Sequence, residues 1–282
     1  MTEPIAINAG GHESAPSNEV TPAHGSGFAL HHVLQPLVFV LLVAVWYGAT
    51  KILAIPSYLL PSPFSVAGQF IRDVTDVNFY AHVQVTLTEI LAGFAAAAVS
   101  AIILGAVVAA IPLLEAVLTP YIVAFQTMPK VALAPLAIIW LGYGISSKIV
   151  LSALIAFFPA FVNIVAGFKS IDPDQLLLMK SLGATRQQTF IKVRLPAILP
   201  FLMAGLDIAI VFAVIGSVVV EFIGSAMGLG SLILQRQANV DVAGVMSVLA
   251  VLSIIGVALH LILLTASRRF TSWADQRDFA AP

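Results

Sequence analysis

Six long apolar stretches constrain the fold of this chain more than any other feature of its sequence. A membrane-spanning helix needs about 20 largely apolar residues, because each adds about 1.5 Å towards a hydrocarbon core about 30 Å thick. The stretches that reach this length are 33–53, 85–111, 117–141, 149–168, 199–222 and 244–266. None shows the two-residue alternation of an outer-membrane barrel strand. The sequence therefore predicts an all-α, polytopic membrane helix bundle of about six transmembrane helices.

The overall composition supports this prediction and excludes several other functions. Hydrophobic residues make up 60% of the chain and charged residues 10%, whereas soluble domains carry about 25% charged residues. The formal net charge of −1 gives no general attraction for nucleic acid. The absence of cysteine excludes disulfides, thiolate metal sites and cysteine nucleophiles.

The two ends of the chain differ in composition from the segment between them. Residues 1–32 contain no Lys or Arg, so they lack the basic segment of a secretory signal. We expect them to form a disordered cytoplasmic N-terminal tail. Residues 33–266 are then the transmembrane domain, with a polar loop at 169–199, and residues 267–282 form a cytoplasmic C-terminal tail.

Basic residues predict the orientation in the membrane, because cytoplasmic loops carry an excess of Lys and Arg. With six spans, eight basic residues fall on the side of both termini and loop 169–199: Lys169, Lys180, Arg186, Lys192, Arg194, Arg268, Arg269 and Arg277. The opposite side receives four: Lys51, Arg72, Lys148 and Arg236. This distribution places both termini and the loop in the cytoplasm.

The second and third spans suggest different kinds of packing. Small residues recur every four positions in the second span, at Gly93, Ala97, Ala101, Gly105 and Ala109. A face of small residues lets two membrane helices approach closely. The third span contains three prolines, Pro120, Pro129 and Pro135. Irregular backbone at membrane depth is tolerated only inside protein or beside a water-filled cavity, so we expect this span to face the bundle interior and line the path.

Loop 169–199 is too polar to lie in the bilayer and has its own helical pattern. It begins with Asp172-Pro173-Asp174, a typical helix start with acidic residues in the first turn. A helical run follows, then Gly183-Ala184-Thr185, then a second run that we expect to end at Leu195-Pro196. A cytoplasmic helix–Gly–helix element held between two spans is suited to dock against another protein.

This loop resembles the EAA loop of ABC importer permeases. The family pattern is Glu-Ala-Ala, three residues, Gly, nine residues, then Ile-x-Leu-Pro. Here nine residues separate Gly183 from Val193, and Leu195 and Pro196 are in register, while Leu177-Leu178-Met179 replace Glu-Ala-Ala. Other segments resemble the nitrate/sulfonate/taurine branch of these permeases: 60–63, 128–136, 140–144, 221–224 and 228–230.

The resemblance implies a pore-forming transmembrane subunit of an ATP-driven ABC importer in the bacterial inner membrane, working by alternating access. Its partners would be a second permease copy in a homodimer, two ABC ATPase subunits and a periplasmic or lipid-anchored solute-binding protein. ATP and Mg would bind the ATPase, and no cofactor would bind this chain. This agrees with the absence of a Gly-x-x-x-x-Gly-Lys-Ser/Thr phosphate loop from the sequence. The cargo would be a small anion such as a sulfonate, taurine or nitrate; relatives carry pyrimidine or flavin precursors. The residues expected to contact the ATPase are Asp174, Lys180, Ser181, Leu182, Gly183, Ala184, Thr185, Val193, Leu195 and Pro196.

Polar residues within the spans are candidates for the translocation path: Gln126, Thr127, Lys130, Asn163, Asp207 and Glu221. A charge at membrane depth costs about 2.5–3.5 kcal/mol on insertion scales. Lys130 therefore either attracts an anionic solute or orders a gate, or pairs with an acid or a carbonyl to stabilise the broken helix. Asn163 could hydrogen-bond towards this region, and Asp207 or Glu221 could pair with Lys130. The alternative function is a secondary transporter driven by an ion gradient, which would need these two carboxylates. No His-Glu-x-x-His motif occurs, and we expect neither a metal site nor catalysis.

Overall fold

Four long helices form the body of the molecule, which is known from a computed structural model that describes residues 27–271. They are α3 (Val77–Ala110), α6 (Ile145–Lys169), α9 (Leu195–Gly224) and α11 (Val242–Phe270). Each is long and apolar enough to cross a membrane. They cover the predicted spans 149–168, 199–222 and 244–266 and nearly all of 85–111. The predicted all-α helix bundle is thereby confirmed.

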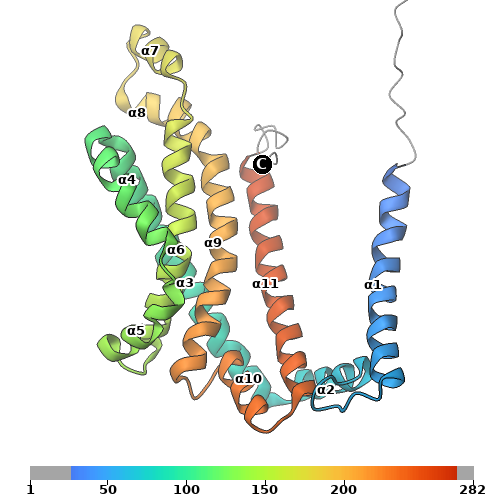
Figure 1. Cartoon of the computed structure of the whole chain (residues 1–282). Helices are drawn as coiled ribbons and strands as arrows, with labels where there is room; N and C mark the ends of the chain where they lie inside the picture. Colours follow the sequence, from blue (N-terminus) through green and yellow to red (C-terminus); the bar gives the residue numbers. More distant parts are fainter. Residues whose placement is uncertain (1–26, 272–282) are drawn as a thin grey trace, which may run out of the picture.

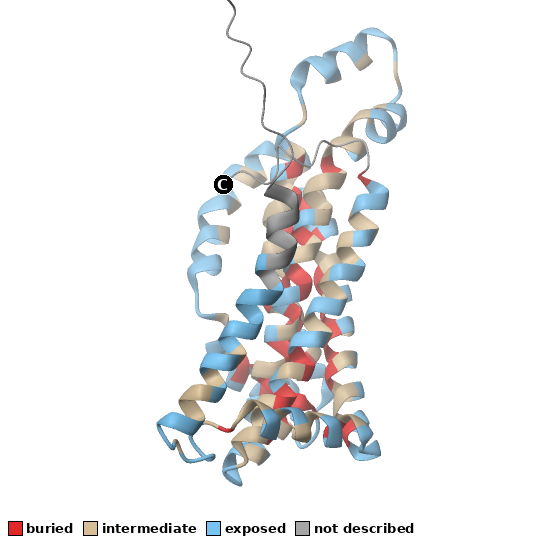
Figure 2. Ribbon diagram, turned by 90° about the vertical axis from the view of Figure 1, so that its right-hand side faces the viewer, coloured by how far each residue is buried: buried red, intermediate tan, exposed pale blue. Residues whose placement is uncertain are grey.

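The core lies where α6 runs between α3 and α9, and small residues permit this close approach. A Cβ atom added to Gly93 of α3 would lie 2.6 Å from the Cβ of Ser152, and one added to Gly216 of α9 would lie 2.8 Å from the Ser152 Cα. The Ser152 hydroxyl donates a 3.0 Å hydrogen bond to the Ala213 carbonyl across the same contact. Figure 2 shows the buried residues gathered on the inner faces of these helices. The small-residue face predicted for the second span is thus the surface that packs against α6.

The third predicted span, 117–141, is not a single helix. It consists of α4 (Pro112–Thr127), the short 3-10 helix η1 (Lys130–Leu133) and α5 (Ala134–Leu141), and it bends by 85°. The bend falls at Met128, whose extended backbone (ψ 134°) is the conformation that the following proline favours.

The predicted interior position of this span holds within the chain for α5, which buries Ala134, Ala137 and Ile138, but not for α4 and η1. No residue of α4 or η1 is buried among the described residues. In Figure 1 α4 and α5 lie along the outer side of α6, away from α11. The polar and broken segment therefore faces outward from this chain.

The first predicted span corresponds to α1 (Gly27–Ile52), which begins within the predicted tail rather than at Val33. It stands apart from the other long helices in Figure 1 and reaches them through α2 (Pro63–Thr75). The remaining predicted tail residues, 1–26 and 272–282, lie outside the described residues. Four helices are long and apolar enough to span a membrane, and the bent pair could form a fifth span. The predicted total of six requires α1 to span as well, and it stays a prediction.

Short helices occupy the two ends of the bundle. At one end, α2 packs near α10 (Leu229–Ala238) and the start of α11. At the other end, α7 (Pro173–Ser181), α8 (Arg186–Thr189) and the wide π turn η2 (Phe190–Arg194) form loop 169–199. The loop thus projects from the end of the bundle opposite α2 and α10.

Candidate functional site

Loop 169–199 projects beyond the ends of the long helices as two short helical arms (Figure 1). The first arm, α7, begins at Asp172, whose carboxylate accepts a 2.9 Å hydrogen bond from the Asp174 amide. Of the ten residues predicted to contact the ATPase, seven are exposed and three are half-buried. The half-buried ones are Ala184, Val193 and Pro196.

Gly183 ends the first arm in a tight, fully hydrogen-bonded cap. Its φ of +68° is left-handed, and its amide donates to the Lys180 carbonyl at 3.1 Å while the Ala184 amide donates to Met179 at 3.0 Å. These two bonds define a Schellman motif, in which glycine is favoured because it has no Cβ. A Cβ added to Gly183 would meet no atom within 4 Å. Glycine is therefore needed here for its backbone conformation and not for space within this chain.

Thr185 starts the second arm only one residue after this cap. Its hydroxyl accepts a 3.2 Å hydrogen bond from the Gln188 amide, and the Gln188 side chain accepts a 2.8 Å bond from the Thr185 amide. This reciprocal capping box satisfies backbone donors that would otherwise lack partners. The turn from Gly183 to Thr185 is thus fixed by the backbone on both sides.

The sequence predicts that the second arm ends at Leu195-Pro196, but in the structure it continues. It passes through η2 directly into α9, so that Arg186–Gly224 forms one continuous helical run. Within η2 the Leu195 amide donates to the Phe190 carbonyl, five residues back. Pro196 has no amide proton, and a wide turn just before it lets the chain continue without a break. The loop is therefore mechanically continuous with a membrane-spanning helix.

Three of the predicted path residues lie together at the break between α4 and η1. The Lys130 ammonium donates a 3.0 Å hydrogen bond to the Gln126 carbonyl in the last turn of α4. It also lies 5.1 Å from the centre of the Phe158 ring of α6. Gln126 and Thr127 are exposed beside it. Lys130 thus caps the broken end of α4, and among the described residues it has no carboxylate partner.

The other three candidates do not join this group. Asn163 donates to the Pro159 carbonyl of its own helix at 2.8 Å, so the expected bond towards the Lys130 region is not made. Asp207 of α9 pairs with His260 of α11, with 2.6 Å between Oδ1 and Nδ1. Glu221 accepts hydrogen bonds from the Thr86 hydroxyl and the Gly230 amide, at 2.6 and 2.5 Å. Neither carboxylate pairs with Lys130.

Residues 101–277, more than half of the chain, match the family described as the binding-protein-dependent transport system inner membrane component. The chain belongs to this family. Several transport permeases match it over most of the length of both chains. The formylaminopyrimidine transport permease protein ThiX of Halalkalibacterium halodurans is 35% identical over 80% of this chain and 90% of its own length. The riboflavin transport system permease protein RibX of Chloroflexus aurantiacus is 34% identical, over 84% and 89% respectively. The taurine transport system permease protein TauC of Escherichia coli is 30% identical, over 82% and 86%. The expected resemblance to ABC importer permeases is confirmed.

The permease also contains a buried ion pair that the sequence analysis missed. Lys148 of α6 lies 2.7 Å from Glu89 of α3, and both side chains are almost fully buried. Ser217 donates to Glu89 at 3.0 Å, and Lys148 donates to Ser225 at 2.6 Å. The signal was present, because Glu89 lies four residues before Gly93 and so belongs to the small-residue face that contacts α6. For Lys148 the sequence predicts a different position, in a connection outside the membrane on the side opposite the termini.

A second polar cluster connects the short helices at the same end of the permease. Arg236 of α10 binds Asp73 of α2 through two hydrogen bonds of 2.6 and 2.7 Å. Ser247 of α11 and Gln69 of α2 donate to the same carboxylate. Asp73 is only 4% exposed. This carboxylate therefore joins α2, α10 and α11 into one unit.

Proposed function

We propose that this permease forms half of the translocation pore of an ATP-driven importer, as one of two identical copies. The observation that carries the proposal is the unpartnered face of α4, η1 and α5. Lys130, Gln126 and Thr127 lie on this face between exposed apolar side chains such as Phe125 and Trp140, which are 55% and 74% exposed. A cation at membrane depth needs protein or water around it. A second copy facing this surface would provide both and enclose a polar path.

The energy for transport would come from two separate ATPase subunits that bind ATP and Mg and dock on loop 169–199. Two features support this assignment. The loop is rigidly capped at Gly183 and Thr185. It also continues without a break into α9, so movement imposed on it reaches a membrane-spanning helix directly. With this assignment the loop and both termini lie in the cytoplasm, and a solute-binding protein delivers cargo from the opposite side of the inner membrane.

Our first candidate for the cargo is a small organic anion such as a sulfonate, taurine or nitrate. Lys130 supports it, because its charge is unpaired among the described carboxylates and lies where two copies would meet. A taurine permease is among the relatives.

A second candidate, a planar heterocycle, has support from aromatic side chains beside Lys130. The rings of Phe125 and Phe158 stack with centres 6.2 Å apart, and Phe157 and Phe161 continue the group. The exposed ring of Phe125 at the end of this group offers a stacking surface to a pyrimidine or a flavin precursor. The permeases for formylaminopyrimidine and riboflavin among the relatives agree with this candidate.

The test is uptake by proteoliposomes that contain the permease, its ATPase and its solute-binding protein. Uptake should require ATP and persist when ionophores collapse ion gradients; gradient-dependent uptake without ATP would favour a secondary transporter instead. Competition between taurine, an alkanesulfonate, formylaminopyrimidine and riboflavin then decides the cargo.

A separate experiment tests the second copy. Because the chain has no cysteine, Thr127→Cys provides a single thiol at the break. Thr127→Cys should form a disulfide-linked dimer in membranes. Ile254→Cys, on an exposed face of α11, serves as the control and should stay monomeric. A dimer formed by both variants or by neither would contradict the proposed arrangement.

A further inference from the structure

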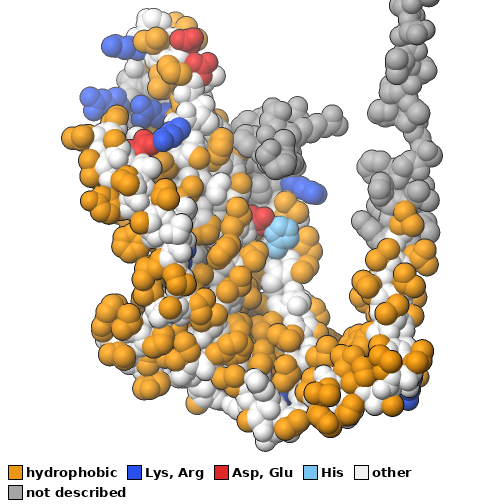
Figure 3. Space-filling model, viewed as in Figure 1, with side chains coloured by type: hydrophobic (Ala, Val, Ile, Leu, Met, Phe, Trp, Pro, Cys, Tyr) orange, Lys and Arg blue, Asp and Glu red, His pale blue; other side chains and the backbone are white. Residues whose placement is uncertain are grey.

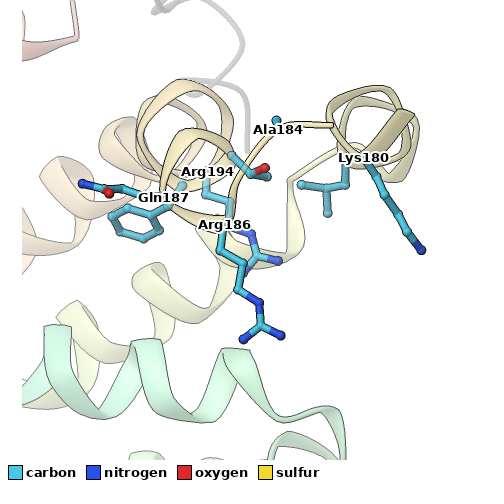
Figure 4. A pocket seen from close by; sticks show the side chains of 8 residues that line it. Lys180, Ala184, Arg186, Gln187 and Arg194 are labelled. Carbon is cyan, nitrogen blue, oxygen red and sulfur yellow. The ribbon is translucent and has the colours of Figure 1, made fainter. Parts of the chain in front are cut away.

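A cavity of about 790 Å³ separates the two arms of loop 169–199. Leu176 and Lys180 of α7 line one side, and Arg186, Phe190 and Arg194 line the other. Figure 4 shows both arginines on one arm with their side chains directed into the space below the turn, and Lys180 on the other arm with its ammonium directed away from them. The lining thus combines the apolar side chains of Leu176 and Phe190 with three cationic residues.

None of these three cations is neutralised within the described part of the chain. Lys180, Arg186 and Arg194 take part in no ion pair there, although nearby Lys169 pairs with Glu115. The loop contains five basic residues against two acidic ones, Asp172 and Asp174. Both acids lie at the start of α7, whereas Lys180 lies in its last turn. The cavity therefore has a net positive potential that the loop itself does not balance.

Positive charges gathered around one cavity repel each other, and an anion bound among them removes this repulsion. Two arginines favour a carboxylate in particular, since the planar guanidinium donates two parallel hydrogen bonds to it. The first arm, α7 with its C-cap Leu182, also carries exposed apolar side chains. Leu177, Leu178 and Leu182 are 62%, 58% and 71% exposed. Because this arm projects beyond the ends of the long helices, these leucines need cover from a protein surface (Figure 1).

We propose that the cavity receives an acidic side chain, Asp or Glu, from the surface of the ATPase subunit. The carboxylate is held by Arg186 and Arg194 of one arm, with Lys180 of the other arm at the edge of the cavity. The three leucines pack against an apolar groove beside that acid. The inference rests on the proposed docking of an ATPase on this loop, and it adds the sign and the place of the charge that the ATPase must present.

The test uses charge reversal in the full permease, embedded in nanodiscs made only of phosphatidylcholine. Arg186→Glu and Arg194→Glu should each weaken binding of the ATPase subunit about tenfold, a loss of about 1.4 kcal/mol. The dependence of affinity on salt concentration should also become shallower in both variants. Lys192→Glu is the matched control, because Lys192 is an exposed cation of η2 outside the cavity lining, and it should stay within about twofold.

Several outcomes separate this inference from its alternatives. Equal loss in Lys192→Glu would show a general charge effect and overturn the specific site. Unchanged ATPase binding, with an effect only after phosphatidylglycerol is added, would assign the cavity to a lipid headgroup. If the wild-type permease itself fails to bind the ATPase, the proposed function fails; if wild type and arginine variants bind equally, only this inference fails.

A compensating change guards against misfolding of the arginine variants. An acid-to-lysine change on the ATPase should restore binding of Arg194→Glu while weakening binding of wild type. The site is wrong if no acidic position in the docking groove of the ATPase gives this rescue.

Discussion

Lys148 and Glu89 stabilise each other in a place where neither would be stable alone. Each is nearly inaccessible to solvent, and two serines complete their hydrogen bonds. Removing one member of a buried pair typically costs about 3–5 kcal/mol, because the other charge is left without a partner. Removing both can be nearly neutral when the replacements have a similar shape.

We therefore predict that Lys148→Met lowers the thermal unfolding temperature of the detergent-solubilised permease more than the double variant Glu89→Gln/Lys148→Met does. The physical reason is the unpaired carboxylate that only the single variant leaves buried. Thermal unfolding followed by size-exclusion chromatography measures both variants. A single variant as stable as wild type would show that the pair contributes nothing.

Gly183 gives a prediction about backbone conformation. Its positive φ disfavours residues with a Cβ, and asparagine tolerates this region better than alanine does. Because the space around Gly183 is open, a large side chain there would strain the local backbone but would not clash with other residues of the chain. We expect Gly183→Asn to retain ATPase association best, Gly183→Ala to weaken it, and Gly183→Glu to lose it or to associate without coupled transport.

The measurement for Gly183 combines membrane insertion, ATPase co-purification, solute uptake and substrate-stimulated ATP hydrolysis. All three variants should insert normally. Wild-type values for Gly183→Glu in every assay would mean that the loop does not couple the ATPase to the spans.

At the scale of elements, the carboxylate of Asp73 holds α2 against α10 and α11. Burial alone would raise the pKa of Asp73, but hydrogen bonds from Arg236, Ser247 and Gln69 outweigh it and hold that pKa below the ordinary value of 3.8. A carboxylate with a lowered pKa in the folded state stabilises that state fully above its unfolded pKa. The contribution disappears as the pH falls through the lower, folded-state pKa.

We predict that Asp73→Asn lowers the unfolding temperature at every pH from 5 to 8 by a nearly constant amount. Below pH 3.8 the difference from wild type should shrink, because wild type then loses the same charge. Unfolding temperatures measured across this pH range test the prediction. Arg72→Gln is the control, since Arg72 is exposed and its side chain, among the described residues, bonds only to the Gln69 side chain, and it should change little. A difference that widens at low pH would contradict the assignment.

Helix lengths and an irregular third span were predictable from the sequence, but the position of the break in that span was not. Apolar runs of about 20 residues identify spans because lipid accepts little else. Prolines alone do not identify breaks: Pro120, Pro159 and Pro200 lie inside continuous helices. At Pro129 the chain also leaves the helical region at Met128, and Lys130 then caps the free carbonyl of Gln126. The extended backbone of Met128 and the capping contact of Lys130 distinguish this proline from those that lie inside continuous helices.

For the whole molecule, the candidate site was predictable in part, and the reason differs between its two regions. Gly183 and the loop around it follow a local pattern, in which helix starts and glycine caps are encoded within a few residues. The path candidates depend on which helices meet. Asp207 finds its partner in α11, 53 residues away in sequence, and Glu221 finds partners in α3 and α10, 135 and 9 residues away. No local pattern reports such pairings.

The orientation of the whole permease can be tested with two single cysteines. Thr185 and Asn78 are exposed residues at opposite ends of the bundle (Figure 1). Figure 3 shows that charged side chains on the visible face gather at the end that holds the loop. We predict that Thr185→Cys reacts with a membrane-impermeant maleimide only from the cytoplasmic side and Asn78→Cys only from the periplasmic side. Labelling from the reversed sides would contradict the six-span topology.

The unbroken run from Arg186 to Gly224 gives the permease a long lever. Its 39 residues correspond to a rod about 58 Å in length. Two hydrogen bonds fix the far end of this rod to α3. Glu221 accepts one from Thr86, and Ser217 donates the other to Glu89. A tilt of about 5° about that fixed end displaces the tip of the loop by about 5 Å, which is about one helical turn. A movement of a few ångströms imposed on the loop would therefore rotate α9 by only a few degrees, so the end of the bundle that carries the loop can open while its opposite end hardly moves.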